Sequence, residues 1–303
     1  MPYRRTLGDW FDRPGSRWLL GKVATSYVRR ILRDDVEILH LNGLWTHRIG
    51  SIFFPDGRTF ASVYSNFGNW KTEAREYASD AAEFWLKHYW PKQGDVIVDV
   101  GAGRGEDTLT FSRAVGKTGR VIAIEASPLS FAMLQNFCLL NGLANVTALH
   151  VALMNKRGTV RLRKDQSTWK QDSIVGGDES SGIEVEGKTL DQICREMGIN
   201  QIALLKMNIE GGERHALLGM DSVLPHIRQI CVACHDFRSA KGEGEQFRTR
   251  AFVEQFLTKH GFSLTSDPDD PRDYVRDHVF GMRSGPHSLA TEREINESWG
   301  VSM

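Results

Sequence analysis

Hydrophobic and polar residues alternate in blocks from residue 91 onward, and the blocks predict strands and helices in turn. Short apolar runs typical of buried strands fall at 95–100, 120–125, 146–153, 203–207, 227–234, 262–265 and 278–282. Stretches that predict helices lie between them, at 108–115, 128–141, 190–197, 213–218 and 247–260. This alternation is typical of a mostly parallel sheet with helices on both faces. We therefore predict an α/β domain over residues 71–285, entered through a helix at 72–89.

The first seventy residues follow a different pattern and are predicted to form an N-terminal extension or cap. Leu19, Val23, Tyr27 and Ile31 recur every four residues, which predicts an amphipathic helix at 17–33. Short strands follow it, with a Pro-Asp-Gly turn signal after Phe54. Residues 1–33 carry eight Lys and Arg against two Asp. Such a helix either packs on the main domain or lies on an anionic surface, so residues 16–33 are a candidate for weak membrane association.

Composition narrows the class of protein. The 303 residues are 41% hydrophobic and 25% charged, and 38 Lys and Arg balance 38 Asp and Glu. A net charge of zero makes nucleic acid an unlikely main partner. No apolar run approaches the ~18 residues of a membrane span, and residues 1–15 lack the apolar block of a secretory signal. Four cysteines without framework spacing fit a reducing compartment, so we expect a cytoplasmic protein, with a polar tail at 286–303.

A glycine-rich loop after the first predicted strand carries the strongest chemical signal. It reads Asp99-Val-Gly101-Ala-Gly103-Arg-Gly105-Glu106. Dinucleotide-binding loops need Gly-x-Gly-x-x-Gly, with a pyrophosphate on the following helix N-terminus. Here Glu106 stands in place of the third glycine and would repel a pyrophosphate. The flanking acids suit a cationic cofactor without phosphate, which favours S-adenosylmethionine.

The second predicted strand supports the same interpretation. Glu125 ends it, twenty residues after Gly105, and an acid at this place can accept hydrogen bonds from both ribose hydroxyls. The predicted cofactor contacts are Asp99, Gly101, Ala102, Gly103, Gly105, Glu106, Thr108, Glu125, Ala126, Ser127, Ala152 and Asn208.

These motifs resemble class I S-adenosylmethionine-dependent methyltransferases, and further stretches resemble the FkbM-type family. The similar stretches are 99–105, 125–128, 189–191, 205–213 and 234–237, within about half of the chain. The resemblance implies a Rossmann-like seven-stranded sheet, mostly parallel with an antiparallel last strand. It also implies methyl transfer, usually to a hydroxyl oxygen of a sugar or a natural-product scaffold.

One departure from the family's pattern concerns a metal. The family has an aspartate where this chain has Asn208. An amide oxygen is a poorer ligand for a hard cation than a carboxylate, which puts a bound Mg²⁺ in doubt. We predict no metal ligand in this chain; if Mg²⁺ binds, Glu210, Glu213 and Asp236 are the residues that could still contribute.

Methyl transfer requires an aligned acceptor oxygen and a group that removes its proton. In an open α/β sheet the site lies at the carboxyl ends of the strands. This selects Asn208 and Glu210 after one strand and His235 and Asp236 after the next, with Lys206 in the family-like run. His235 is the first choice for the base, because an ordinary imidazole titrates near ~6.5, and Asp236 is the alternative. Trp169, in the irregular segment 155–187, is a candidate to cover the acceptor.

The sequence thus predicts an S-adenosylmethionine-dependent O-methyltransferase that acts on a small or lipid-linked hydroxylated acceptor, a sugar or a secondary metabolite. Two alternatives stay open. One is a methyltransferase that acts on RNA or protein, for which the basic residues 1–33 argue and the neutral overall charge does not. The other is a non-catalytic cofactor-binding scaffold on the same fold, for which Asn208 argues.

Overall fold

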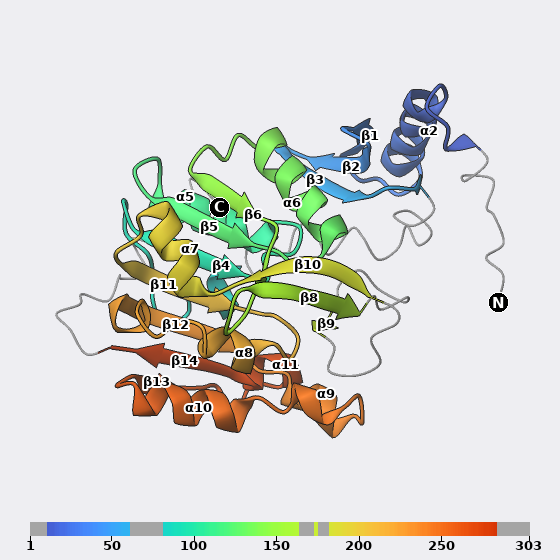
Figure 1. Ribbon diagram of the computed structural model, residues 1–303. Helices are drawn as coiled ribbons and strands as arrows, with labels where there is room; N and C mark the ends of the chain where they lie inside the picture. Colours follow the sequence, from blue (N-terminus) through green and yellow to red (C-terminus); the bar gives the residue numbers. More distant parts are fainter. Residues whose placement is uncertain (1–10, 61–80, 164–172, 175–181, 284–303) are drawn as a thin grey trace.

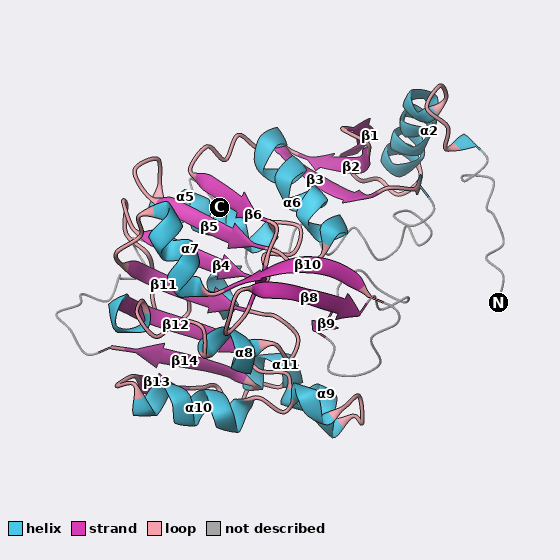
Figure 2. Cartoon of the chain, viewed as in Figure 1, coloured by secondary structure: helices cyan, strands magenta, loops and turns pink. Residues whose placement is uncertain are grey.

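The computed structural model describes residues 11–60, 81–163, 173–174 and 182–283. Figures 1 and 2 show a central sheet with helices on its two sides and a smaller layer of strands and one helix above it. Within the described ranges, no helix combines the length and the apolar character needed to cross a membrane. The predicted polar tail at 286–303 and Trp169 lie outside the described residues.

Seven strands form the central sheet. Their order across it is β13 (Ser263–Thr265), β14 (His278–Met282), β12 (Ile227–Ala233), β11 (Ile202–Met207), β4 (Val96–Val100), β5 (Arg120–Ile124) and β6 (Val146–Leu149). Every pairing is parallel except those of β14, which is antiparallel to both β12 and β13. This confirms the predicted Rossmann-like sheet with its antiparallel last strand, and it brings the ends of β4, β5 and β11 together at one edge.

Two apolar layers hold helices against the faces of this sheet, because side chains alternate along each strand. The described helices of the domain are α5 (Glu106–Val115), α6 (Pro128–Leu140), α7 (Leu190–Met197), α8 (Glu213–Leu217), α9 (Asp236–Ala240), α10 (Arg250–Lys259) and α11 (Asp273–Arg276), with 3₁₀ turns at Leu224–His226 and Glu245–Phe247. Helices α7, α8 and α10 pack in a cluster with Val98 and Ile122. Phe111 of α5 packs with Ile97 on the other face.

The predicted strand at 146–153 is wrong in one respect, because the chain changes sheets within it. Residues 146–149 join the central sheet as β6, whereas β7 (Ala152–Leu153) belongs to a second sheet of order β7-β10-β8-β9. That sheet also contains β8 (Gly158–Arg163), β9 (Ser173–Ile174) and β10 (Ile183–Lys188). The largely apolar run at 146–153 did not indicate this change of sheet.

The predicted helix at 72–89 ends early. Within the described part, only residues 81–84 are helical, and Trp85 and Leu86 instead enter the core. The sequence also gave no sign of the short helices α9 and α11. Both are shorter than two turns, so neither has a recognisable apolar period.

A separate layer precedes the main sheet. It consists of α2 (Arg17–Arg30) and an antiparallel sheet of β1 (Val36–Leu41), β2 (Leu44–Ile49) and β3 (Ile52–Gly57). The layer is attached to the main domain through α6. The amide of Asn141 donates to the Phe53 carbonyl at 2.8 Å and accepts from the Phe53 N–H at 2.9 Å, and the Phe54 and Phe137 rings lie 5.8 Å apart.

Candidate active site

A cavity of about 300 Å³ opens at the carboxyl ends of β4, β5 and β11. The predicted cofactor residues that line it are Gly101, Ala102, Gly103, Glu106, Glu125, Ala126, Ser127, Ala152 and Asn208. Residues predicted for catalysis, Lys206 and Glu210, line it as well. We call it the cofactor cavity.

Close contact between two strand ends fixes the glycine loop. Gly101 has φ +74°, and a Cβ there would lie 1.9 Å from the carbonyl oxygen of Asn208. The N–H of Asn208 in turn donates to the Val100 carbonyl at 2.9 Å. Gly101 is therefore required both for its backbone conformation and for the space that it leaves. Gly103 also has a positive φ, +58°, but nothing lies within 4 Å of its missing side chain.

Glu125 holds the loop from the next strand. Its carboxylate accepts the N–H of Gly103 at 2.8 Å with one oxygen and the N–H of Ser127 at 2.8 Å with the other. Burial raises the pKa of this carboxyl group to about 7, although both backbone hydrogen bonds favour the ionised form. The predicted ribose acceptor thus lies in the cavity wall.

Asp99, Gly105 and Thr108 were predicted to contact the cofactor, but the structure places them behind the cavity wall. Asp99 is fully buried, where it accepts the Thr108 hydroxyl at 2.6 Å and pairs with the Lys206 ammonium at 2.8 Å. Gly105 caps α5, and a Cβ there would lie 2.9 Å from the Phe137 ring. These three residues support the loop from below.

Lys206 lies at the floor of the cofactor cavity with its charge already compensated. Its ammonium also donates to the Gly101 carbonyl at 2.8 Å and lies 3.5 Å from Asp107. Burial alone would lower the pKa of Lys206, but the carboxylates of Asp99 and Asp107 outweigh it and raise that pKa. A lysine that stays protonated cannot act as a base, so its role here is to hold the floor of the loop.

A second cavity, of about 420 Å³, adjoins the first, and we call it the acceptor cavity. Glu106, Asp107, Asn208 and Glu210 line both cavities. The remaining wall is aromatic and charged, and it is formed by Phe84, Trp85, His235, Phe237, Arg238, Glu243, Tyr274 and His278, together with Ala233. The Trp85 and His278 rings are stacked 4.7 Å apart, and Phe84 meets Tyr274 edge-on at 6.1 Å.

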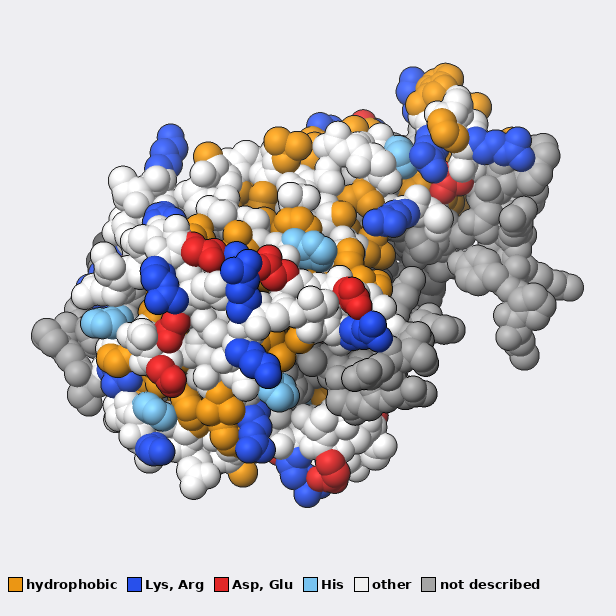
Figure 3. Space-filling view, viewed as in Figure 1, with side chains coloured by type: hydrophobic (Ala, Val, Ile, Leu, Met, Phe, Trp, Pro, Cys, Tyr) orange, Lys and Arg blue, Asp and Glu red, His pale blue; other side chains and the backbone are white. Residues whose placement is uncertain are grey.

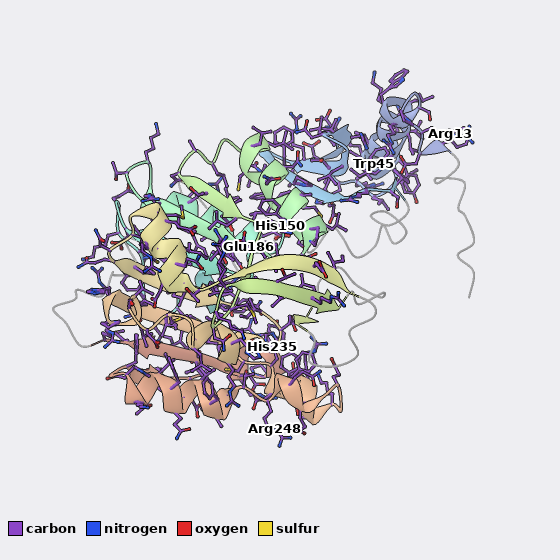
Figure 4. All side chains as sticks on the ribbon, viewed as in Figure 1. Arg13, Trp45, His150, Glu186, His235 and Arg248 are labelled. Atoms are coloured by element: carbon purple, nitrogen blue, oxygen red, sulfur yellow. The ribbon has the colours of Figure 1, made fainter. Side chains whose placement is uncertain are left out.

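His235 follows β12 and lies between two carboxylates; it is labelled in Figure 4. Its Nδ1 lies 3.1 Å from Glu213 and its Nε2 lies 3.4 Å from Glu210. Burial would lower the pKa of this imidazole, but the two carboxylates raise it to about 10. His235 is therefore an imidazolium at neutral pH, and the expectation of a neutral imidazole that accepts a proton does not fit this environment.

Glu210 connects the imidazolium to a guanidinium. Its second oxygen pairs with Arg238 at 2.5 Å, and Arg238 also pairs with Glu243 at 2.6 Å. Burial would raise the pKa of Glu210, but His235 and Arg238 lower it below its ordinary value. Glu210 also has φ +52°, a conformation that a non-glycine residue adopts only when its surroundings impose it. The network thus fixes a charged wall beside the acceptor cavity.

Asp236 was predicted as the alternative base, and its hydrogen bonds point to a different role. One carboxylate oxygen accepts the N–H of Thr249 at 3.0 Å and the N–H of Arg250 at 2.9 Å. These groups begin α10, and Asp236 lines neither cavity. A carboxylate in this position stabilises a helix start.

Asp107 was missed by the sequence analysis, although it stands between the predicted residues Glu106 and Thr108. It lies in the first turn of α5, lines both cavities and keeps 24% of its side chain exposed. Burial first, and then the carboxylates of Asp99 and Glu106, raise its pKa to about 7 despite the neighbouring Lys206 ammonium. The 100° step between helix residues points Glu106, Asp107 and Thr108 in three different directions, but it does not show which of them faces the cavity.

The prediction of no metal ligand stays a prediction. Within the described ranges, no group of three or more His, Cys, Asp or Glu is arranged to hold a metal ion. Asn208 itself carries a buried Oδ1 for which the described residues supply no hydrogen-bond donor.

The order of the sheet, the acid-flanked glycine loop and the acid at the end of β5 define a methyltransferase of the class I type. The family model described as "Methyltransferase FkbM domain" matches residues 99–264. The chain belongs to this family of methyltransferases.

The chain is also similar to individual proteins, at low sequence identity. The chain is 27% identical over 252 residues to "31-O-demethyl-FK506 methyltransferase FkbM" of Streptomyces tacrolimicus, with 73% of this chain and 92% of the relative covered. It is 25% identical over 205 residues to "Methyltransferase sdnD" of Sordaria araneosa, with 56% and 74% covered. A solved structure of methyltransferase FkbM from Methylobacillus flagellatus is similar with 17% identity and a TM-score of 0.41, over 73% of this chain and 60% of that one.

Proposed function

We propose that this chain transfers a methyl group from S-adenosylmethionine to a hydroxyl oxygen of a small acceptor, a sugar or a secondary metabolite, in the acceptor cavity. The observation that supports this most is the junction of the two cavities, where Asp107 and Asn208 face both. A donor group in one cavity and an acceptor oxygen in the other can meet there. The name of the Streptomyces relative, which gives 31-O-demethyl-FK506 as its acceptor, also favours oxygen.

The charge of the cofactor cavity fits S-adenosylmethionine. Glu106, Asp107, Glu125 and Glu210 line it, and the one ammonium on its floor, Lys206, is paired with Asp99. Such a cavity favours a cation and disfavours a pyrophosphate. The buried Oδ1 of Asn208 is available to accept an N–H or O–H at the junction.

The acceptor cavity fits a hydroxylated molecule with an apolar face. Phe84, Trp85 and Tyr274 line it and give it an apolar wall, and the carboxylate of Glu243 can accept a hydrogen bond from a hydroxyl group. Sites of this kind orient a small molecule with a few polar groups in a largely apolar surround.

S-adenosylmethionine supplies a methyl group on a positively charged sulfur. The protein has to align the acceptor oxygen and take its proton, and we assign the proton to Asp107. A general base works best with a pKa near the working pH. The pKa of Asp107 is about 7. The pKa of His235 is about 10, so this side chain already holds its proton at neutral pH. Burial lowers the pKa of His278 to about 3, so that imidazole is a weak base. Asp107 thus replaces His235 and Asp236 as the proposed base.

The test uses S-adenosylmethionine labelled on its methyl group, incubated with the full chain and a fractionated extract of the source cells. Label in the small-molecule, glycan or lipid fraction is expected, and it should be absent with the Asp107→Asn variant. Label in the RNA or protein fraction would overturn the proposed acceptor class. Cofactor binding without label in any fraction would overturn the proposed enzyme in favour of a scaffold.

A further inference from the structure

The outer face of α2 carries a row of exposed apolar side chains. Leu19, Val23, Tyr27 and Ile31 follow one another at every fourth position, and they are exposed by 51%, 58%, 45% and 64%. Trp18, beside them, is 63% exposed. Hydrophobic groups and Lys or Arg side chains lie side by side over α2 in Figure 3.

The other side of the same helix explains why this row is not needed for folding. Gly21, Ala24 and Val28 are the buried residues of α2. A Cβ at Gly21 would lie 2.8 Å from the Ile38 carbonyl of β1, so the helix sits directly on the small sheet. The spacing of residues 19, 23, 27 and 31 predicted the helix and left open whether it packs on the main domain or lies on an anionic surface. In the structure this row is exposed, and Gly21, Ala24 and Val28 are buried instead.

Basic side chains accompany the exposed row. Between residues 11 and 33 there are six Lys and Arg and one acid, Asp12, in a chain whose total charge is balanced. Asp12 pairs with Arg17 at 2.6 Å, and Arg29 pairs with Asp35 at 3.1 Å. For the part of the chain that the structure describes, Lys22, Arg30 and Arg33 form no ion pair; the Lys22 ammonium lies 5.0 Å above the Trp18 ring.

A groove next to the row adds to this basic character. It lies between α2 and β1, has a volume of about 530 Å³ and is lined by Arg17, Lys22, Arg29 and Arg30, with Glu37 as its acid. Figure 4 places Trp45, of the same layer, in the part of the molecule opposite His235, so this surface is separate from the active site.

We propose that α2 docks this protein on the surface of an anionic membrane, with the apolar row in the boundary between headgroups and acyl chains and the basic residues among the headgroups. Charge complementarity selects a lipid surface that carries phosphate and carboxylate groups. Tryptophan and tyrosine favour this boundary, because a ring enters the apolar layer while its polar atom stays in water. An amphipathic helix with bases on its polar side binds through both contributions.

The experiment measures co-sedimentation of the full chain with vesicles of phosphatidylcholine alone and of phosphatidylcholine with phosphatidylserine. Binding is expected only with phosphatidylserine and should weaken with added salt. The triple variant Lys22→Gln, Arg30→Gln, Arg33→Gln should bind about 100-fold more weakly, at about a factor of five per charge. Val23→Glu with Ile31→Glu should weaken binding at least about tenfold, since two side chains no longer enter the apolar layer.

The matched control is Leu139→Glu, because Leu139 is 71% exposed on α6 and lies outside the row. It should bind like the native chain, and cofactor affinity should be unchanged in every variant, which separates this proposal from the proposed methyl transfer. No binding of the native chain to anionic vesicles would overturn the proposal. Equal binding to neutral vesicles would also overturn the proposal. Self-association of the native chain that Val23→Glu abolishes would overturn it too, because the row would then be a contact between two copies.

Discussion

The cofactor cavity and the acceptor cavity share a wall, but the chain builds them in opposite ways. The first is formed largely by strand ends and a glycine loop, and backbone atoms of Gly101, Gly103 and Asn208 set its shape. The second is formed by side chains from segments as distant as Phe84 and His278. Under the proposed function, backbone geometry would select the cofactor, whereas side chains from distant segments would select the acceptor.

The largest expected effect tests the shared wall. Asp107→Asn should lower kcat by about 10²–10⁴-fold, because the amide cannot accept the proton. Cofactor affinity should fall much less, since Asp107 is only one of the four carboxylates that line the cofactor cavity. In the native enzyme kcat should fall as the pH drops below about 7, where the Asp107 carboxylate becomes protonated. Steady-state kinetics across neutral pH measure both effects.

The matched control for this variant is Asp236→Asn. The carboxylate of Asp236 accepts the first N–H groups of α10, so its variant should lower the free energy of unfolding by about 1 kcal/mol with kcat retained. If Asp236→Asn abolished turnover while Asp107→Asn retained it, the assignment of the base would be reversed.

The next effect concerns the acceptor wall and should appear in stability. His235→Ala leaves Glu210 and Glu213 buried without their shared cation, which should cost about 3–5 kcal/mol of unfolding free energy. The pKa of His235 is about 10 in the folded state and near the ordinary imidazole value of 6.5 in the unfolded chain. Its contribution to stability is therefore complete below pH 6.5 and declines as the pH rises toward 10.

Denaturant unfolding of the native chain and of His235→Ala at several pH values measures the contribution of His235 to stability. The gap between native and His235→Ala should narrow in alkali. The fall in kcat at low pH should persist in the variant. Its disappearance would restore His235 as the base.

These two cavities also mark what the sequence could and could not predict. Periodicity was enough for most strands and helices of the main sheet, and the family resemblance implied its seven strands and antiparallel last strand. Glu125 was predictable because its place follows from a strand end at a fixed distance from the loop. His235 was found, but its charge was not, because Glu210 and Glu213 reach it from another strand end. Asp107 was missed because neither motif nor period separates one helix residue from its neighbours. Contacts between distant segments decide protonation, and a pattern along the chain does not contain them.

A smaller effect compares two glycines within the cofactor loop. Gly101→Ala forces a Cβ against the Asn208 carbonyl and should cost about 3 kcal/mol of stability, with loss of cofactor binding. Gly103 also has a positive φ, but the space around it is open, so about 1 kcal/mol is expected for Gly103→Ala. Thermal unfolding and calorimetric titration of both variants measure this. Equal costs would mean that the close approach of the two strand ends does not shape the cavity.

The smallest effect sharpens the role assigned to Glu125. Glu125→Gln keeps an acceptor and the size of the side chain but removes the charge, so cofactor affinity should fall by about 2 kcal/mol, or roughly 30-fold. Because the pKa of Glu125 is about 7, the native affinity for a cationic cofactor should also weaken as the pH falls through that value.

Asp107 has a similar pKa, so the pH dependence of cofactor affinity is compared in Glu125→Gln and in Asp107→Asn. Glu125 accounts for it if the dependence is lost only in Glu125→Gln, since this carboxylate is the one that also holds the loop through Gly103. An affinity unchanged in Glu125→Gln would mean that the ribose acceptor lies elsewhere in the wall, and that backbone geometry alone selects the cofactor.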